Sequence, residues 1–312
     1  MFTTDTKQTT NDIFLIRPAH FGFNPETAAD NTFQSNEGDL SKKEIQKLAI
    51  DEFDLLVRRL KDAEINVHVF EDTEKPIKSD AVFPNNWVSF HHDSFVVTYP
   101  MYSLNRRQEK REDILDELSN EFKISKRYSF DYYEEKDKFL EGTGSMVLDR
   151  ANQMIYACLS ERTDIKILEK FAVLSNFRKL MFHAYDRQGK PIYHTNVMMA
   201  IGQKIAVVCL ECITDEIERK NLVTSLKNAG KVIIEISLEQ VEAYAGNVLE
   251  LKKPDGSGLL VMSEQSFKAF TAEQIGVMKQ HVDFLYSAIP TIEKYGGGSV
   301  RCMIAEIFLE KK

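Results

Sequence analysis

Cysteine is scarce in this sequence, with four residues among 312, at positions 158, 209, 212 and 302. Four cysteines are too few for a disulfide scaffold, and such usage is typical of the reducing cytoplasm, where we expect the protein to lie. Cys209 and Cys212 form a C-x-x-C pair, a spacing found in redox sites and zinc sites. No second pair of cysteines or histidines lies nearby, and the surrounding segment AVVCLECI is apolar. The pattern therefore favours two strand cysteines that pack as small hydrophobic side chains.

The sequence also lacks a positive net charge and any long apolar run. Its formal net charge is -8, whereas phosphate binding needs a basic face, so the charge argues against nucleic acid as a main partner. The charged runs Lys42–Lys43 and Arg106–Arg111 also carry acids, and this pattern predicts solvated helix faces. No apolar run approaches the ~20 residues that a membrane helix requires. The N-terminal MFTTDTKQTTND has no apolar segment of a secretory signal, so we expect neither export nor a membrane partner.

Helix and strand patterns alternate from one end of the sequence to the other. Helices are predicted to begin at Ser41 and Thr271, where Ser-Lys-Lys-Glu and Thr-Ala-Glu-Gln form capping boxes, and near Asn105, Asp164 and Thr214. Between them lie short β-branched and aromatic runs: IFLIR, NVHVF, SFVVTYP, QMIYACL, KIAVVCL and KVIIEI. Because no low-complexity linker interrupts the alternation, the sequence predicts a single α/β domain over residues 1–312.

A weak internal repeat accompanies this alternation. Similar segments begin at positions 83, 140, 193, 245 and 296, with separations of 57, 53, 52 and 51 residues. Each has two strands joined by a polar turn, then a helix and a further strand. The fifth is cut short, and the N-terminal strand and helix complete it. Repeats of this length indicate a propeller or an array, here with pseudo-fivefold symmetry. Closure places five polar residues near one end of a central channel: Asn86, Glu141, His194, Asn247 and Cys302.

Three of these equivalent positions carry side chains that could do chemistry together. Cys302 follows a glycine run, which lets backbone and ligand approach closely. A lone cysteine before an apolar run is more often inert, and a lone histidine such as His194 is more often structural. Glu141 lies in an otherwise apolar segment, where a carboxylate is unexpected without a partner. Together they form a candidate nucleophile, acid/base and orienting group.

The segments FPNNW, LEGTGSMVLDR, YHTNV, GNVLEL and GGGSVRCM resemble those of the guanidino-group modifying enzymes. This amidinotransferase superfamily includes the arginine deiminases, dimethylarginine hydrolases, arginine glycine amidinotransferases and succinylarginine dihydrolases. The closest resemblance is to the arginine-deiminase-related branch associated with citrulline utilisation. It covers nearly the whole chain and implies a five-bladed α/β propeller, the pentein fold.

The resemblance also implies roles for the reactive residues. Cys302 is the expected nucleophile, His194 the general acid/base and Glu141 the carboxylate that assists it. The thiolate adds to the planar carbon, His194 protonates the departing nitrogen, and a water then hydrolyses the S-linked intermediate. The family mechanism uses no metal and no organic cofactor.

Two positions depart from the arginine deiminase pattern. Those enzymes hold the guanidinium with two aspartates, whereas the matching residues here are Asn86 and Asn196. Two carboxylates suit a cation that offers only N–H donors, but an asparagine offers a donor and an acceptor, which suits a ureido group. The favoured substrate is therefore citrulline, giving ornithine, carbon dioxide and ammonia. Asparagines before strands are also common turn residues, and succinylarginine dihydrolases also lack the aspartate pair.

An amino-acid substrate also has an α-carboxylate, for which arginine is the natural partner. Arg17 and Arg301 are the candidates for it, and Asp30 or Asn31 for the α-amino group, although structural ion pairs would explain the arginines equally well. The polar segment 21–37 is either a lid or a fixed surface loop.

Several functional alternatives remain open at this point. They are hydrolysis of arginine, transfer of the amidino group to an acceptor amine, and a non-catalytic binding role on the same fold. The sequence does not determine the oligomeric state, for which a homodimer is one candidate.

Overall fold

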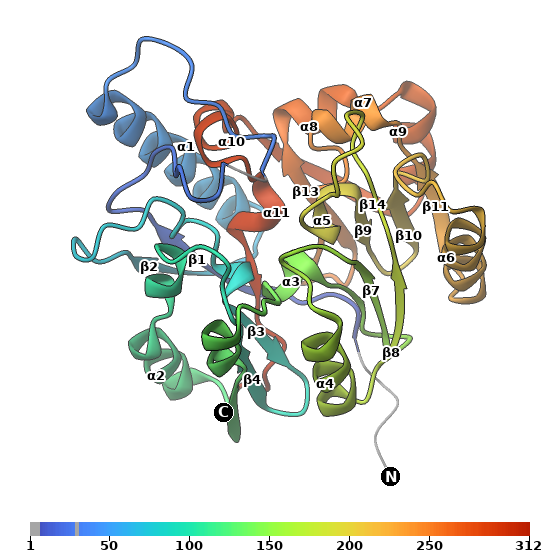
Figure 1. Cartoon of the computed structure of the whole chain (residues 1–312), viewed down its shortest axis with the longest axis horizontal. Helices are drawn as coiled ribbons and strands as arrows, with labels where there is room; N and C mark the ends of the chain where they lie inside the picture. The colour runs from blue at the N-terminus through green and yellow to red at the C-terminus, as the bar shows by residue number, and fades with distance from the viewer. Residues whose placement is uncertain (1–6, 29–30) are drawn as a thin grey trace.

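The computed structural model describes residues 7–28 and 31–312 and contains five three-stranded sheets (Figure 1). In each sheet the middle strand pairs antiparallel with one neighbour and parallel with the other. In hydrogen-bonded order, the sheets are β15 (Ala305–Glu306), β1 (Asp12–Arg17), β2 (Asn66–Glu71); β3 (Val88–His91), β4 (Phe95–Thr98), β5 (Lys126–Ser129); β6 (Val147–Asp149), β7 (Met154–Cys158), β8 (Arg178–Phe182); β9 (Met199–Ile201), β10 (Ile205–Val208), β11 (Val232–Glu235); and β12 (Leu249–Lys252), β13 (Gly258–Ser263), β14 (Val282–Ser287). The α/β class and five units agree with the sequence repeat.

The first of these sheets is built from both ends of the chain. β15 pairs antiparallel with β1, through Ile13 with Glu306 and Phe14 with Ala305. β1 then pairs parallel with β2. The prediction that the N-terminal strand and helix complete the last unit is therefore confirmed.

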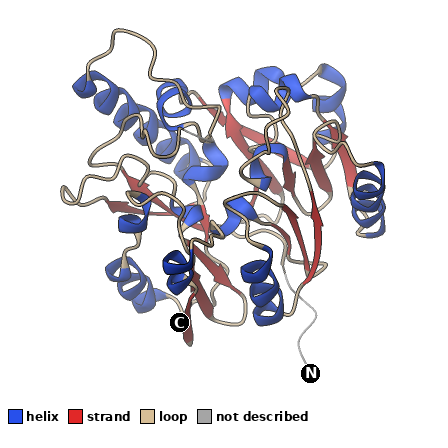
Figure 2. Ribbon diagram, viewed as in Figure 1, coloured by secondary structure: helices blue, strands red, loops and turns tan. Residues whose placement is uncertain are grey.

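In every unit a helical segment connects the two parallel strands, as such a crossover requires. Figure 2 shows these helices on the outside of the sheets. They are α1 (Lys42–Asp62), α2 (Glu112–Glu121), α4 (Ile165–Ser175), α6 (Glu216–Asn228), and α8 (Glu264–Ala269) with α9 (Ala272–Met278). The capping boxes predicted at Ser41 and Thr271 are both present. At Asn105 the structure differs, because a 3₁₀ turn precedes α2, which begins at Glu112.

Shorter helical segments complete the chain. Four of them lie just before the first strand of a unit: η1 (Pro84–Asn86), α3 (Gly142–Ser145), α5 (Thr195–Met198) and α11 (Val300–Met303). The others are η2 (Arg106–Glu109), η3 (Asp131–Lys136), α7 (Leu238–Glu242) and α10 (Pro290–Gly296). α3 contacts both η1 and α5, and η1 contacts α11, so these turns gather at the centre of the molecule (Figure 1).

Within the described ranges, four buried hydrophobic clusters pack between the sheets and helices. Cys209 and Cys212 lie in the largest of them, fully buried and free. They follow β10, which ends at Val208, so the prediction that they lie in the strand is wrong, while their packing as hydrophobic side chains is confirmed. Among the described residues, no helix has the length and apolar character needed to cross a membrane.

Candidate active site

Glu141, His194 and Cys302 lie at the central turns of three units. Glu141 is the N-cap of α3, His194 is the N-cap of α5, and Cys302 lies in α11. His194 and Cys302 line one small cavity of about 20 Å³, which has room for about one water molecule. Nε2 of His194 lies 2.8 Å from Oε2 of Glu141. The structure thus brings together the three residues that the repeat and the resemblance predicted.

Glu141 is a buried, ionised carboxylate. It is fully inaccessible to solvent, and its Oε1 accepts a hydrogen bond from the Tyr102 backbone N–H at 2.9 Å. Its Oε2 lies 3.4 Å from a guanidinium nitrogen of Arg162. Burial acts to raise the pKa of Glu141, but the Arg162 charge and the His194 hydrogen bond outweigh it and hold the pKa well below its ordinary value. Such a carboxylate accepts hydrogen bonds and does not donate them.

This carboxylate sets the tautomer of His194. Because Glu141 only accepts, Nε2 of His194 carries the proton, and Nδ1 of the neutral ring keeps its lone pair. Burial lowers the pKa of His194, an effect that Glu141 opposes and that the charges of Arg162 and Arg106 reinforce. The imidazole is therefore neutral near pH 7, with a base at Nδ1.

Cys302 lies among amide groups. Nδ2 of Asn247 is 3.3 Å from its Sγ, Nδ2 of Asn196 is 3.6 Å away, and Oδ1 of Asn247 is also 3.6 Å away. Cys302 is the only one of the four cysteines that lines the cavity. By contrast, burial raises the pKa of Cys158 to about 11. The amide N–H groups can stabilise a negative charge on the sulfur of Cys302.

Two amide atoms at the site are buried without a hydrogen-bond partner among the described residues. They are Nδ2 of Asn86 and Oδ1 of Asn196. The orientation of the Asn86 amide is fixed, because its Oδ1 accepts a hydrogen bond from Arg106 at 2.9 Å. These two amides therefore offer one unpaired donor and one unpaired acceptor.

Gly144 allows Asn86 and His194 to come close. A Cβ at position 144 would lie 2.3 Å from Nδ2 of Asn86 and 2.8 Å from Nδ1 of His194. Any side chain here would displace both groups, since real Cβ contacts are longer. The glycine in Glu-Gly-Thr-Gly is thus required for the close packing of the site.

The two arginines predicted to bind an α-carboxylate lie elsewhere, which corrects that prediction. Arg17 forms a bidentate ion pair with Asp54 at 2.8 and 2.9 Å, and it does not line the cavity. Arg301 turns to the other side of α11, where it pairs with Glu306 at 3.1 Å and lines a different cavity. Asp30 lies outside the described residues.

Three charged residues that no sequence pattern indicated line the cavity instead: Asp80, Arg106 and Arg162. Arg106 is 3 % exposed, in contrast to the solvated face predicted for its charged run. Its guanidinium forms a bidentate pair with Glu109, at 2.9 Å for both contacts. Oδ2 of Asp80 accepts from Asn24 at 2.8 Å, whereas its Oδ1 is buried with no partner among the described residues. Two cations and a free carboxylate oxygen therefore accompany the predicted residues.

The described part of segment 21–37 covers this cavity. Asn31 lines it, with Nδ2 donating to the carbonyl of Gly297 at 3.3 Å. Nε2 of Gln34 donates to the carbonyl of Gly296 at 2.9 Å. The segment is thus held against the glycine run that precedes Cys302, and its role as a lid stays a prediction.

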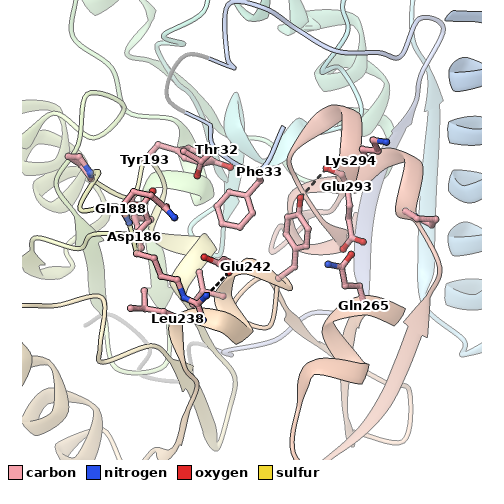
Figure 3. Close-up of a pocket in the computed structure, with 16 residues that line it drawn as sticks. Thr32, Phe33, Asp186, Gln188, Tyr193, Leu238, Glu242, Gln265, Glu293 and Lys294 are labelled. Carbon is pink, nitrogen blue, oxygen red and sulfur yellow. Dashed lines mark hydrogen bonds and ion pairs between the residues drawn. The ribbon is translucent and has the colours of Figure 1, made fainter. Parts of the chain in front are cut away.

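A larger cavity of about 420 Å³ adjoins the small one, and Tyr193 lines both (Figure 3). Phe33, from the covering segment, packs against Tyr193 and Tyr244, with ring centroids 6.5 and 5.2 Å apart. Figure 3 shows Phe33 between the side that carries Gln188 and the side that carries Glu293. The covering segment and Tyr193 therefore separate the catalytic residues from this outer cavity.

Comparison of the sequence with known families gives one match over most of the chain. The family described as N,N dimethylarginine dimethylhydrolase, eukaryotic, matches residues 17–309. Comparison with curated proteins finds no match.

Solved structures with the same fold include an arginine dihydrolase and a dimethylarginine hydrolase. ArgZ, an arginine dihydrolase from the ornithine–ammonia cycle in cyanobacteria, superposes with a TM-score of 0.74 at 14% identity over 95% of this chain. The chain spans 40% of the length of ArgZ. The N-terminal domain of ArgZ bound to substrate has a TM-score of 0.72 at 15% identity, covering 96% of this chain and 99% of that domain. A dimethylarginine dimethylaminohydrolase adduct with S-methyl-L-thiocitrulline has a TM-score of 0.64 at 14% identity, covering 97% and 100%. The resemblance predicted from the five sequence segments is confirmed.

Proposed function

The chain belongs to the N,N-dimethylarginine dimethylhydrolase family, and from this premise we propose that it hydrolyses the ureido or guanidino group of an α-amino acid at Cys302. The favoured substrate is citrulline, which yields ornithine, carbon dioxide and ammonia. Arginine, carried through the same site to ornithine, is the second candidate, since ArgZ with the same fold is an arginine dihydrolase.

The pair of unsatisfied amide atoms supports the ureido substrate. Nδ2 of Asn86 is a donor and Oδ1 of Asn196 is an acceptor, both without partners among the described residues. A ureido group carries a C=O and N–H groups, so it satisfies both atoms, whereas a guanidinium has only donors and leaves Asn86 unpaired. A buried polar atom left without a partner costs about 1–3 kcal/mol.

The chemistry follows from the arrangement of Cys302, His194 and Glu141. Nδ1 of His194 takes the proton of the Cys302 thiol as the sulfur adds to the ureido carbon, and the imidazolium then delivers this proton to the terminal nitrogen, which leaves as ammonia. Nδ1 of His194 then removes a proton from a water that attacks the resulting thiocarbamate carbon and releases the thiolate. The carbamate that leaves loses carbon dioxide and becomes ornithine. Glu141 holds the imidazole in the required tautomer.

The α-amino acid end fits the remaining charges of the cavity. Arg162 lines the cavity and carries a guanidinium group of the kind that binds a carboxylate, whereas Arg106 is paired with Glu109, and the free Oδ1 of Asp80 suits an ammonium group. A cavity of about 20 Å³ is too small for the substrate, so we propose that segment 21–37 opens to admit it.

The architecture that presents these residues is a single catalytic domain spanning 1–312. We propose that the five sheets close into a five-bladed propeller, with the catalytic residues at one end of its channel. The four central turns, which carry or follow the equivalent polar residues, support this arrangement.

The test is turnover by the purified protein of L-citrulline, L-arginine, Nω,Nω-dimethyl-L-arginine and N-succinylarginine, with Cys302→Ala as control. Ammonia and the amino-acid product are measured for each. Ornithine from citrulline, absent with the variant, is the expected result. Accumulation of citrulline from arginine or dimethylarginine, without ornithine, would overturn the ureido assignment and keep the nucleophile.

A non-catalytic role is tested separately by alkylation. A catalytic Cys302 is expected to react with iodoacetamide rapidly near neutral pH. Slow alkylation together with no turnover of the four substrates would favour a binding protein.

A further inference from the structure

Arg150 is a buried arginine without a counterion close by. It follows β6 and is 3 % exposed. Its side chain makes one hydrogen-bond contact within the described ranges, at 3.4 Å to Nδ1 of His91, and no carboxylate there lies within 4.0 Å of it. The guanidinium carbon lies 3.8 Å from the centre of the Phe308 ring. Burial holds the pKa of His91 well below its ordinary value, so this histidine is neutral and adds no charge.

Arg150 lines a small cavity, which we call the arginine cavity. It has a volume of about 30 Å³, and its polar lining comes mainly from Arg150, Arg301, Glu306 and Gln8. Gln8 closes one side, since its Nε2 donates to the carbonyls of Leu148 at 3.0 Å and Ile201 at 3.2 Å. The rest of the lining is largely apolar and comes from β6, β9 and β12 and their flanking residues.

The charges around the arginine cavity do not balance. Glu306 is paired with Arg301 at 3.1 Å, so the second guanidinium, that of Arg150, has no anion of its own among the described residues. Burial lowers the pKa of Arg150 to about 10, although Glu306 opposes this effect. An arginine with that pKa is still charged near pH 7. Burying an unpaired charge is costly, and native proteins pair such charges or bind an ion against them.

We propose that the arginine cavity binds one small monovalent anion of chloride size between Arg150 and Arg301. A single negative charge cancels the surplus, and guanidinium N–H groups are the donors that an anion requires. A volume of about 30 Å³ holds one or two water-sized particles, which excludes phosphate and carboxylic acid metabolites.

The proposed anion lies next to the turn that carries the nucleophile. Arg301 lines the arginine cavity, and the next residue, Cys302, lines the catalytic cavity. Both belong to α11. An anion held by Arg301 therefore stabilises the folded state through the turn that carries Cys302. This inference does not depend on which substrate the enzyme takes.

The experiment combines diffraction with thermal unfolding of the full chain. Crystals grown in bromide are expected to show an anomalous peak between the two guanidinium groups. In solution, Tm is expected to be a few degrees higher in chloride than in gluconate, which is too large for the cavity. Ionic strength is held constant, because salt also screens surface charges.

Two variants separate the arginine cavity from surface effects. Arg150→Met removes the charge at similar length and is expected to abolish the difference in Tm between the two salts. Arg58→Met, at an exposed position in α1, is expected to keep it. An equal difference in Arg150→Met would overturn the proposal. If Arg150→Met does not fold, the absence of a bromide peak in the wild-type crystals would overturn it.

Discussion

Nδ2 of Asn247 lies 3.3 Å from Sγ of Cys302, and the same nitrogen donates to the backbone carbonyl of Asn196 at 3.0 Å. The carbonyl can only accept, so it fixes which end of the amide faces the sulfur. One N–H of Asn247 therefore holds the side chain in place and the other points to Cys302. Asn247 occupies the fourth position of the repeat, whereas Glu141, His194 and Cys302 occupy the second, third and fifth.

Asn247→Ala is expected to slow the alkylation of Cys302 by iodoacetamide near neutral pH. A hydrogen bond to a charged group contributes about 1.5–3 kcal/mol, so loss of this donor to the thiolate is expected to lower the rate by about 10- to 100-fold. Mass spectrometry of the alkylated protein over time measures the rate. Asn247→Asp is expected to slow alkylation further, because a carboxylate repels the thiolate. Asn228→Ala, at an exposed position, serves as the control, and an unchanged rate in Asn247→Ala would show that its amide does not stabilise the thiolate.

Glu141→Gln is expected to slow catalysis and to shift its pH dependence. The carboxylate raises the pKa of His194, against the larger opposing effect of burial. Removing the charge therefore lowers that pKa, and the acid limb of the kcat profile moves to lower pH. The weaker base and the disturbed tautomer reduce kcat by about 10²- to 10⁴-fold. An acid limb that stays in place or moves to higher pH would contradict the assignment of Glu141 as the partner of the base.

Asn86→Asp is expected to change substrate preference. The substitution keeps an acceptor for Arg106 and replaces the unpaired donor with a negatively charged acceptor, which suits a guanidinium better than a ureido group. We expect the ratio of kcat/KM for arginine to that for citrulline to rise by about 10²-fold, in line with the cost of mismatched buried polar groups. Steady-state kinetics with both substrates measures the ratio.

Asn196→Asp provides the comparison for this change. Its Oδ1 is already an acceptor, whereas its Nδ2 lies 3.6 Å from the Cys302 sulfur. A carboxylate there places an anion beside the thiolate, so activity is expected to fall for both substrates. If both variants change the ratio equally, the donor–acceptor argument fails.

The repeat explains why much of the site could be predicted from the sequence. Four equivalent turns lie just before the first strand of a unit, so residues at one phase of the repeat, such as Glu141 and His194, meet at the centre. The capping boxes at Ser41 and Thr271 could also be predicted from the sequence, because they depend on residues three positions apart. In each case the signal is local, or it recurs with the period of the fold.

The charged residues of the cavity lack such a signal. Arg106 lies in a run of mixed charge, which is typical of a solvated surface. Its bidentate pairing with Glu109 offsets the free-energy cost of burying its charge. Arg162 and Asp80 come from connections that no repeat marks. Conversely, Arg17 has the right residue type for carboxylate binding, but it forms an ion pair with Asp54 on α1 and is therefore not available at the cavity. Long-range pairing of this kind becomes visible only in three dimensions.

The last prediction concerns Arg162 and separates carboxylate binding from structural support. Arg162→Lys keeps a positive charge near Glu141 but loses the planar fork that binds a carboxylate through two hydrogen bonds. The test is to measure kcat/KM for citrulline and for N-carbamoylputrescine, which has the same ureido group and no α-carboxylate. If Arg162 binds the carboxylate, the preference of the enzyme for citrulline falls by about 10- to 100-fold, mainly through KM.

Structural damage alone would lower turnover of both substrates by the same factor and leave the preference unchanged. Arg17→Lys is the matched control, because Arg17 is paired with Asp54 outside the cavity, and it is expected to preserve the preference for citrulline. A loss of preference in Arg17→Lys, with none in Arg162→Lys, would indicate that Arg17 and not Arg162 binds the α-carboxylate of the substrate. The comparison therefore tests the position of the substrate carboxylate independently of whether either variant is less stable.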